Sequence, residues 1–156
     1  MSELSTPIGG YWLHTRGGRI VALTGAPPAE RADAGLVALV REWLERYFSG
    51  GEPSLEALSL FPAGTGFQQR VWEALRGIPR GRVARYGDMA RELGSAPRAV
   101  GRALGGNPLP ILLPCHRVVA ANGALCGYSG PGGVAAKRFL LELEGVSIRE
   151  NARVNL

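Results

Sequence analysis

Cysteine and histidine are scarce in this chain, and their scarcity excludes several classes of site. Among its 156 residues there are two cysteines, Cys115 and Cys126, and two histidines, His14 and His116. Two cysteines do not make the disulfide framework of a small secreted domain. A structural zinc site with four ligands would need all four of these side chains, and their spacing is not that of a zinc motif. We therefore expect neither a disulfide framework nor a metal site.

Long hydrophobic runs are also lacking. No apolar stretch approaches the length of about 20 residues that is needed to cross a bilayer. Residues 1–5 show neither the basic nor the apolar segment of a secretory signal, so we expect a cytoplasmic protein with no membrane contact. A hydrophobic fraction of 46% with 20% charged residues predicts a packed core. The length suits one domain, or two small domains that share an interface.

Lysine is nearly absent, because all but one of the 18 basic residues are arginine. Residues 1–65 hold 5 arginines against 7 acidic residues, a net charge of −2, whereas residues 66–156 hold 13 basic against 6 acidic residues, a net charge of +7. A basic C-terminal part rich in arginine favours a polyanionic partner. An arginine-rich composition with solvated faces is the alternative, and charge alone leaves both open.

The first 62 residues predict a small domain that contains a sheet and a helix. Residues 7–25 contain short β-prone runs, and Gly17-Gly18 between them predicts a hairpin turn. Residues 35–48 predict an amphipathic helix after the break at Pro27-Pro28. Its apolar positions recur at spacings of three and four: Leu36, Leu39, Val40, Trp43, Leu44 and Tyr47. Residues 51–66, rich in Gly, Pro and Ser, predict a linker to the C-terminal part.

The C-terminal part opens with a predicted helix behind Thr65. Thr65 and Gln68 have the spacing of a capping box, and Gly77 and Pro79 mark the end of the helix. One face of this helix is apolar and carries Phe67, Val71, Trp72 and Leu75. We therefore expect an α+β fold, with a small N-terminal α/β domain (1–62) and a mainly helical C-terminal domain (63–156).

Residues 86–105 predict a helix-turn-helix. A short helix over residues 86–93 is followed by a tight connection, in which Ser95 can cap the second helix and Pro97 suits its first turn. On the second helix, Arg98 and Arg102 lie one turn apart, opposite an apolar face. This is the layout of a basic recognition helix, although many helical hairpins do not bind DNA.

The second helix is also unusually small in its side chains. Gly101 in mid-helix costs about 1 kcal/mol relative to alanine. Close packing against another helix is one explanation, and close approach to a DNA backbone is the other. The small positions are Ala99, Gly101, Ala103 and Gly105.

Residues 111–113 predict a short buried strand that leads into Pro114-Cys115-His116-Arg117. A cysteine beside a histidine fits an activated thiolate, because the imidazole can take the thiol proton. Neighbours in an extended chain point to opposite sides, so such a transfer would need a water relay or a local turn. The alternative is a buried structural cysteine beside a surface histidine.

Taken together, these segments resemble the O6-alkylguanine-DNA alkyltransferases, also called methylated-DNA–protein-cysteine methyltransferases. The resemblance is dense over roughly residues 64–146 and looser before them. The core of the resemblance is Pro114-Cys115-His116-Arg117-Val118, with Gly106-Asn107-Pro108 before it and Gly127-Tyr128-Ser129-Gly130 after it. Matching segments also include residues 67–72, 86–88, 98–101 and 140–145.

The resemblance implies DNA repair by direct reversal of damage. Its implied partner is double-stranded DNA that contains O6-alkylguanine, bound in the minor groove with little sequence preference. The damaged nucleotide would flip out of the duplex, and its alkyl group would pass irreversibly to Cys115. No cofactor is implied, and each molecule would act once. The resemblance also implies a ribonuclease-H-like N-terminal domain, and we expect a monomer.

Four catalytic residues are implied by the resemblance. Cys115 would accept the alkyl group, and His116 would deprotonate it through a bound water. Glu144 would orient His116, with Glu142 as the rival for this role. Tyr86 would hydrogen-bond the flipped guanine and help to protonate it.

A further group of residues would bind DNA or the flipped base. Arg98 would enter the duplex in place of the flipped nucleotide, and Asn107 would brace the turn before the acceptor. Ser129 would bond near O6, and the backbone around Cys115 and Val118 would bind the exocyclic amine. The full set is Arg98, Ala99, Arg102, Asn107, Val118, Tyr128, Ser129 and Arg85.

The chain departs from the family pattern at three places. Arg85 stands where many relatives carry Ser or Thr, and Cys126 falls in a loop beside the expected pocket. The loop over residues 129–133 is longer than the family pattern predicts. Three other readings stay open: a lesion-binding protein without transfer, which the presence of Cys115 opposes, a helix-turn-helix regulator that prefers a defined sequence, and a Cys-His hydrolase that turns over without DNA.

Overall fold

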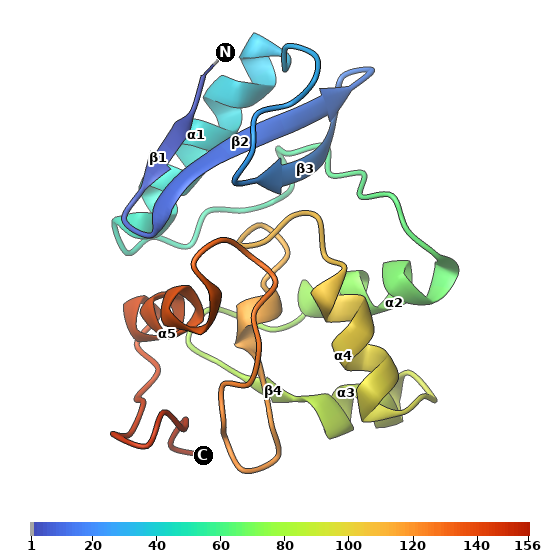
Figure 1. Cartoon of the computed structure of the whole chain (residues 1–156), viewed down its shortest axis with the longest axis vertical. Coiled ribbons are helices and arrows are strands. Elements are labelled where there is room, and N and C mark those ends of the chain that lie inside the picture. Colours follow the sequence, from blue (N-terminus) through green and yellow to red (C-terminus); the bar gives the residue numbers. More distant parts are fainter. Residues whose placement is uncertain (1) are drawn as a thin grey trace.

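The computed structural model describes residues 2–156, and its N-terminal part is a three-stranded antiparallel sheet with one helix (Figure 1). The strands β1 (Leu4–Thr6), β2 (Gly9–Arg16) and β3 (Arg19–Thr24) lie in that order. Gly17 and Gly18 turn between β2 and β3 with φ of +56° and +76°, a conformation that suits glycine. The predicted hairpin is confirmed, whereas β1 lies outside the extended range predicted from the sequence.

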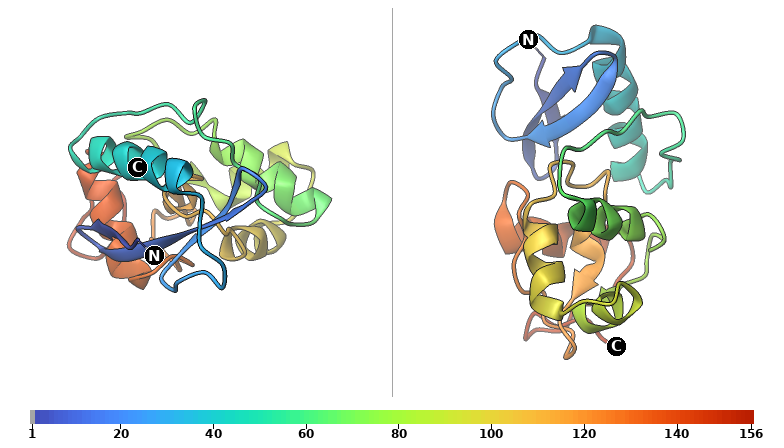
Figure 2. Two further views of the ribbon diagram at one scale, coloured as in Figure 1. Left: turned by 90° about the horizontal axis from the view of Figure 1, so that it is seen from above. Right: turned by 90° about the vertical axis from the view of Figure 1, so that its right-hand side faces the viewer.

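The helix α1 (Ala34–Phe48) covers one face of this sheet (Figure 2). Asp33 caps it by accepting a hydrogen bond from the backbone of Leu36 at 3.0 Å. The prediction of an inward Leu39 is wrong, because this side chain is 42% exposed. The buried stripe instead consists of Val37, Val40, Trp43, Leu44 and Tyr47.

Residues 49–65 join α1 to the C-terminal part and make an isolated β-bridge, between Leu60 and Ile20. The helix α2 (Gly66–Leu75) follows, and the predicted capping box is present between Thr65 and Gln68. The apolar face of α2 packs inward, with Val71, Trp72 and Leu75 buried. The indole of Trp72 donates a hydrogen bond of 2.8 Å to the carbonyl of Ala103, which ties α2 to the helix of that residue.

The predicted helix-turn-helix is present as α3 (Tyr86–Glu92) and α4 (Pro97–Gly105). Pro97 begins α4, as expected. The prediction that Ser95 caps α4 is wrong, because the cap position belongs to Ala96, which has no polar side chain. The backbone of Ser95 instead donates to the carbonyl of Ala90 and closes the end of α3.

The predicted strand over residues 111–113 is also wrong. These residues form buried turns, in which Ile111 has a φ of +73° and the backbone of Leu113 donates to the carbonyl of Leu109. Prolines at positions 108, 110 and 114 explain the difference, since a proline has no N–H to give to a strand ladder. The chain then passes through the 3-10 helix η1 (Cys115–Arg117) into β5 (Val118–Val119).

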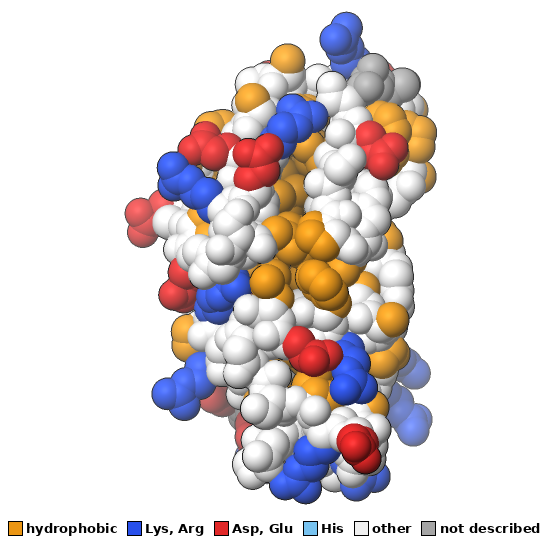
Figure 3. Space-filling view, turned by 90° about the vertical axis from the view of Figure 1, so that its left-hand side faces the viewer, with side chains coloured by type: hydrophobic (Ala, Val, Ile, Leu, Met, Phe, Trp, Pro, Cys, Tyr) orange, Lys and Arg blue, Asp and Glu red, His pale blue; other side chains and the backbone are white. Residues whose placement is uncertain are grey.

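The strand β5 pairs in parallel with β4 (Ala84–Arg85), and the helix α5 (Gly133–Leu143) packs beside η1. A continuous hydrophobic core runs through both parts of the molecule. In Figure 3, hydrophobic side chains also occupy the hollow between the two parts on one side. The arrangement confirms the expected α+β class. In the described chain, no helix is both long and apolar enough to span a membrane.

Candidate active site

A cavity of about 750 Å³ lies between α3, α4 and the loop that follows β5. Five of the residues predicted from the sequence line it: Tyr86, Arg98, Cys115, Tyr128 and Ser129. Most of the remaining wall is made of small residues, which are Gly87, Gly101, Gly105, Ala120, Ala121 and Gly127. Cys126 also lines the cavity, with a φ of +58°. Of the small residues of α4, Gly101 and Gly105 therefore border an opening, whereas Ala103 is buried.

Cys115 lies at the start of η1, where its backbone N–H donates to the carbonyl of Leu113 at 2.7 Å. The residue is 5% exposed. Burial raises the pKa of its thiol, and the polar side chains of Asn107 and Ser129 together with the charge of Lys137 oppose this rise. Since η1 is a tight helical turn, Cys115 and His116 are not held on opposite faces as they would be in a strand.

The imidazole of His116 is fully buried and lies against Glu144. Its Nε2 is 2.7 Å from Oε2 of Glu144. An ionised carboxylate only accepts hydrogen bonds, so Nε2 carries the proton and Nδ1 has a free lone pair. Nδ1 has no partner among the described residues. Burial lowers the pKa of His116, although the bond to Glu144 opposes this, so the imidazole is held neutral and ready to accept a proton at Nδ1.

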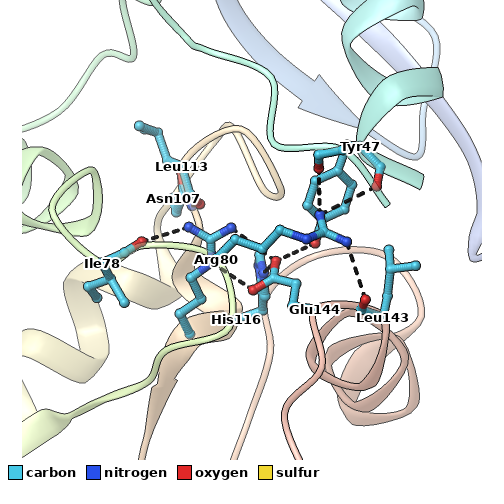
Figure 4. Close-up of polar contacts among 10 residues, drawn as sticks. Tyr47, Ile78, Arg80, Asn107, Leu113, His116, Leu143 and Glu144 are labelled. Carbon is cyan, nitrogen blue, oxygen red and sulfur yellow. Dashed lines mark hydrogen bonds and ion pairs between the residues drawn. The ribbon is translucent and has the colours of Figure 1, made fainter. Parts of the chain in front are cut away.

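Glu144 accepts four hydrogen bonds, which identifies it rather than Glu142 as the partner of His116 (Figure 4). Besides His116, Arg117 donates Nε to Oε1 at 2.8 Å and Nη2 to Oε2 at 3.0 Å. The hydroxyl of Tyr47 donates to Oε2 at 2.5 Å. Burial alone would raise the pKa of Glu144, but the bonds from His116 and Arg117 outweigh it and lower the pKa to about 2. Glu142 lies on the surface and pairs with Arg138.

Arg80 ties the end of α1 to the end of α5 (Figure 4). Its Nη1 donates to the carbonyl of Gly51 at 3.0 Å and of Tyr47 at 3.4 Å, and its Nη2 to the carbonyl of Leu143 at 3.2 Å. The same guanidinium lies 4.9 Å from the centre of the Tyr47 ring. Arg80 therefore joins the N-terminal helix to the residue that directly precedes Glu144.

Asn107 braces the irregular segment before Cys115. Its Nδ2 donates to the carbonyl of Leu113 at 2.9 Å, and its Oδ1 accepts from the backbone of Leu109 at 3.0 Å. The turn is held from the other side as well, because the backbone of Leu23 in β3 donates to the carbonyl of Pro108 at 2.8 Å. Both parts of the chain thus position the backbone that leads to the thiol.

Lys137 is the single lysine of the sequence and is buried at 1% exposure. Its Nζ donates to the carbonyls of Val118 at 2.7 Å and Gly127 at 3.2 Å. Burial lowers its pKa to about 8. Val118 is fully buried and its carbonyl already accepts this bond, so it lies behind the cavity rather than in its wall.

Of the other predicted residues, Arg98 lines the cavity with Tyr86, Tyr128 and Ser129, whereas Ala99, Arg102 and Arg85 are not among the lining residues. Ser129 donates to the carbonyl of Leu104 at 3.3 Å, and the buried hydroxyl of Tyr128 has no partner within residues 2–156. Burial raises the pKa of Tyr86 to about 12. Arg98 and Arg102 are exposed on α4 beside half-buried Ala99, and Arg85 is exposed at β4. This arrangement leaves three guanidinium groups open to solvent.

Sequence analysis did not identify Tyr47, Arg80, Arg117 or Lys137 as parts of this site. Tyr47 is 97 positions from Glu144, and helical periodicity showed only that its ring faces inward. Arg117 lay within a recognised segment and Lys137 within the broader range of the resemblance, but nothing local indicated their partners. In the described part of the chain, no cluster of three or more His, Cys, Asp or Glu residues is arranged to hold a metal ion.

Comparisons with known proteins agree with this geometry. Residues 66–146 match the family described as "6-O-methylguanine DNA methyltransferase, DNA binding domain". The "Methylated-DNA--protein-cysteine methyltransferase" of Salmonella typhimurium is 46% identical over 118 residues, which cover 74% of this chain and 68% of that protein. The constitutive enzyme of that name from Bacillus subtilis is 46% identical over 116 residues, which cover 73% and 69%.

Solved structures are similar over nearly the whole length. The Mycobacterium tuberculosis protein OGT, solved in complex with DNA, has a TM-score of 0.78 and 40% identity, over 91% of this chain and 90% of that one. The O6-methylguanine DNA methyltransferase of Methanococcus jannaschii has a TM-score of 0.70 and 29% identity, over 96% of both chains. From its fold, its matched residues and its relatives, this chain belongs to the 6-O-methylguanine DNA methyltransferase family.

Proposed function

We propose that this chain repairs O6-alkylguanine in double-stranded DNA by moving the alkyl group to Cys115 of its own chain. One observation carries the proposal. Cys115 lines the cavity, and the next residue presents a neutral imidazole whose Nε2 is anchored on Glu144. Family membership supplies the coarser part, namely a methylated-DNA–protein-cysteine methyltransferase that acts in DNA repair. DNA as the partner is supported by the DNA complex of the similar M. tuberculosis protein.

The proposed chemistry is a single displacement. A water bound at Nδ1 of His116 passes the thiol proton of Cys115 to the imidazole, and Glu144 stabilises the imidazolium that forms. The thiolate attacks the alkyl carbon, the new S–C bond replaces the bond from carbon to O6, and guanine leaves with the electron pair. Tyr86 lines the same cavity and donates a hydrogen bond to the leaving base. The reaction uses no cofactor, because the thiol itself is the acceptor.

Access to O6 requires the damaged nucleotide to leave the base stack. Flipping costs a few kcal/mol, and less for a poorly paired base, which favours damaged sites. In the proposed complex, α4 lies in the minor groove, where its small residues allow close approach and little sequence is recognised. Arg98 at the cavity edge fills the place of the flipped base, and Ala99, Arg102 and Arg85 contact the backbone. Tyr128 and Ser129, with the backbone at Cys115, hold the base, and Asn107 keeps the acceptor turn in place.

The transfer is proposed to occur once per molecule and in a monomer. The product is a thioether, which offers no easy leaving group, so the thiol is not regenerated.

We also propose that residues 1–62 and 63–156 are two domains, the first ribonuclease-H-like. The connection over residues 49–65, which holds no helix, supports this division. A cytoplasmic location stays a prediction from the sequence.

The test is the mass of the intact protein after incubation with a duplex that holds one O6-methylguanine, followed by peptide mapping. The expected result is a gain of one methyl group on the peptide that contains Cys115, with no gain from undamaged DNA. Tight lesion binding without mass gain would instead make the protein a lesion-binding protein. Preference for a defined sequence would favour a regulator, and substrate turnover without DNA would favour a hydrolase.

A further inference from the structure

The carboxylate of Glu144 is held from the N-terminal part of the chain as well as from the C-terminal part. Of the four hydrogen bonds that it accepts, three come from η1 and one comes from the hydroxyl of Tyr47 in α1. From this geometry we infer that Tyr47 is a positioning residue, which sets the basicity of His116 through Glu144. The inference rests on the proposed function, in which His116 takes the thiol proton, and it makes the N-terminal part a contributor to thiol activation.

The Tyr47 ring is fixed on several sides, so its hydroxyl has little freedom to turn away. It stacks on Trp43 at 5.4 Å between ring centres with 10° between planes, and Phe48 packs edge-on at 5.1 Å. Arg80 lies over the ring and also holds the carbonyl of Leu143, next to Glu144. The side chain is 2% exposed. A donor fixed to this degree orients the carboxylate rather than following it.

The hydroxyl acts on Glu144 as a hydrogen-bond donor. Burial and the neighbouring carboxylate both raise the pKa of Tyr47, so the phenol stays protonated and donates at any working pH. Oε2 of Glu144 is the atom that receives this bond, and the same atom receives the bond from His116. Charge drawn toward the phenol is therefore charge withdrawn from the imidazole.

This sharing fixes the sign of the effect. Without the hydroxyl, more negative charge stays on Oε2, the imidazolium is better stabilised, and the pKa of His116 rises. The other charged groups that act on His116 are Arg117 in η1 and Lys137 in α5, and both oppose protonation. On Glu144 itself the partners are His116, Arg117 and Tyr47. Substitution of Tyr47 alone leaves the rest of this set in place.

The rate of a transfer that needs neutral His116 falls as the pH drops through the pKa of that residue. Tyr47→Phe keeps the ring and removes the hydroxyl, so the acid limb of the pH–rate profile is expected to move upward by about one pH unit. Loss of orientation is expected to lower the rate on the neutral plateau about ten-fold. A purely structural role would lower the rate by one factor at all pH values and leave the limb where it is.

The matched control is Phe48→Leu. This change removes an aromatic contact from the same helix and the same interface but leaves the Tyr47 hydroxyl intact. Single-turnover rates of methyl transfer from an O6-methylguanine duplex are measured from about pH 4.5 to pH 9 for the full chain and both variants. The control is expected to keep the acid limb of the unmodified protein.

A second variant gives the opposite sign and keeps the fold. Site-specific replacement of Tyr47 by a fluorinated tyrosine retains the shape and makes the phenol a stronger donor, so the acid limb is expected to move to lower pH. An acid limb that stays in place in both Tyr47 variants, or that moves equally in Phe48→Leu, overturns the inference. Failure of the unmodified protein to gain a methyl group is a different result, because it removes the proposed function itself.

Discussion

The two parts of this molecule are built by different means. In the N-terminal part, regular ladders and one long helix hold the chain, and the buried side chains are mostly apolar. In the C-terminal part, the segment from Asn107 to Val119 holds the acceptor thiol without a long element, by hydrogen bonds between side chains and backbone. The buried polar residues Asn107, His116, Lys137 and Glu144 all lie in the C-terminal part. Reactive groups gather where the chain is irregular, and the regular part supports them.

The largest expected effect is the difference in methyl transfer between substitutions of the two cysteines. Both line the cavity, but only Cys115 precedes the imidazole that rests on Glu144. Cys115→Ser is expected to abolish the gain of one methyl group from O6-methylguanine DNA, a loss of at least about a thousand-fold in rate, because the thiolate is the nucleophile. Cys126→Ser is expected to keep the gain. Intact-protein mass is the measurement, and methylation of the Cys115→Ser protein would contradict the proposed acceptor.

Glu144 connects the two parts, so its removal is expected to weaken both. Glu144→Gln leaves the buried end of Arg117 without its counter-charge, which costs about 3–5 kcal/mol in the free energy of unfolding. Glu142→Gln is the control on the same helix end, and it breaks an exposed pair worth about 0.5 kcal/mol. Urea unfolding at neutral pH measures both. Similar midpoints for the two variants would argue that the link between the parts lies elsewhere.

Acid is expected to weaken the same connection between the two parts, because it protonates Glu144. The pKa of Glu144 is lowered to about 2 in the folded chain, below an unfolded value near 4.5. The stabilisation is therefore complete above about pH 5, and it is lost as the pH falls from the unfolded pKa through the folded one. By linkage it amounts to about 3 kcal/mol. Unfolding free energies measured between pH 7 and pH 3 should fall in the unmodified protein and fall less in Glu144→Gln.

The smallest expected effect is on DNA binding, and it compares an arginine of α4 with an arginine of the N-terminal part. Arg102→Ala removes one exposed guanidinium of α4, and it is expected to weaken DNA binding uniformly across sequences and to reduce the salt slope by about one. Arg31→Ala, in the acidic N-terminal part, is expected to change neither quantity. Titration of a fluorescent duplex at several salt concentrations makes the comparison. Equal slopes for both variants would remove α4 from the proposed DNA interface.

Periodic segments could be predicted from the sequence, and the segments that depend on distant partners could not. The helices α1 and α2 and the hairpin of β2 and β3 follow from apolar spacing, from a capping box and from a pair of glycines. The expected strand at residues 111–113 failed, because the apolar run is buried by turns between prolines. Hydrophobicity indicates burial there, but it does not separate a strand from buried turns.

The candidate site was found through its local segments, and its long-range support was missed. Cys115 and His116 were singled out as an adjacent pair of reactive residue types, Glu144 was implied by the resemblance to the family, and the structure adds the contact between the last two. The bonds from Tyr47 and Arg80 join segments far apart in the chain. Such contacts leave no periodic trace in a single sequence, since a buried tyrosine at a helical position looks like any other core residue.

The short pairing of β4 with β5 has a consequence for the spacing of the site. Ala84 lies opposite Val118 and Arg85 opposite Val119. This pairing fixes the position of Tyr86 relative to the segment that follows Cys115. A slip of one residue in this pairing would shift the strand, and Tyr86 directly after it, by about 3.3 Å. The pairing of β4 with β5 thus sets the spacing between the Tyr86 hydroxyl and the Cys115 thiol. Substitutions within the two strands leave this spacing unchanged, whereas an inserted or deleted residue changes it.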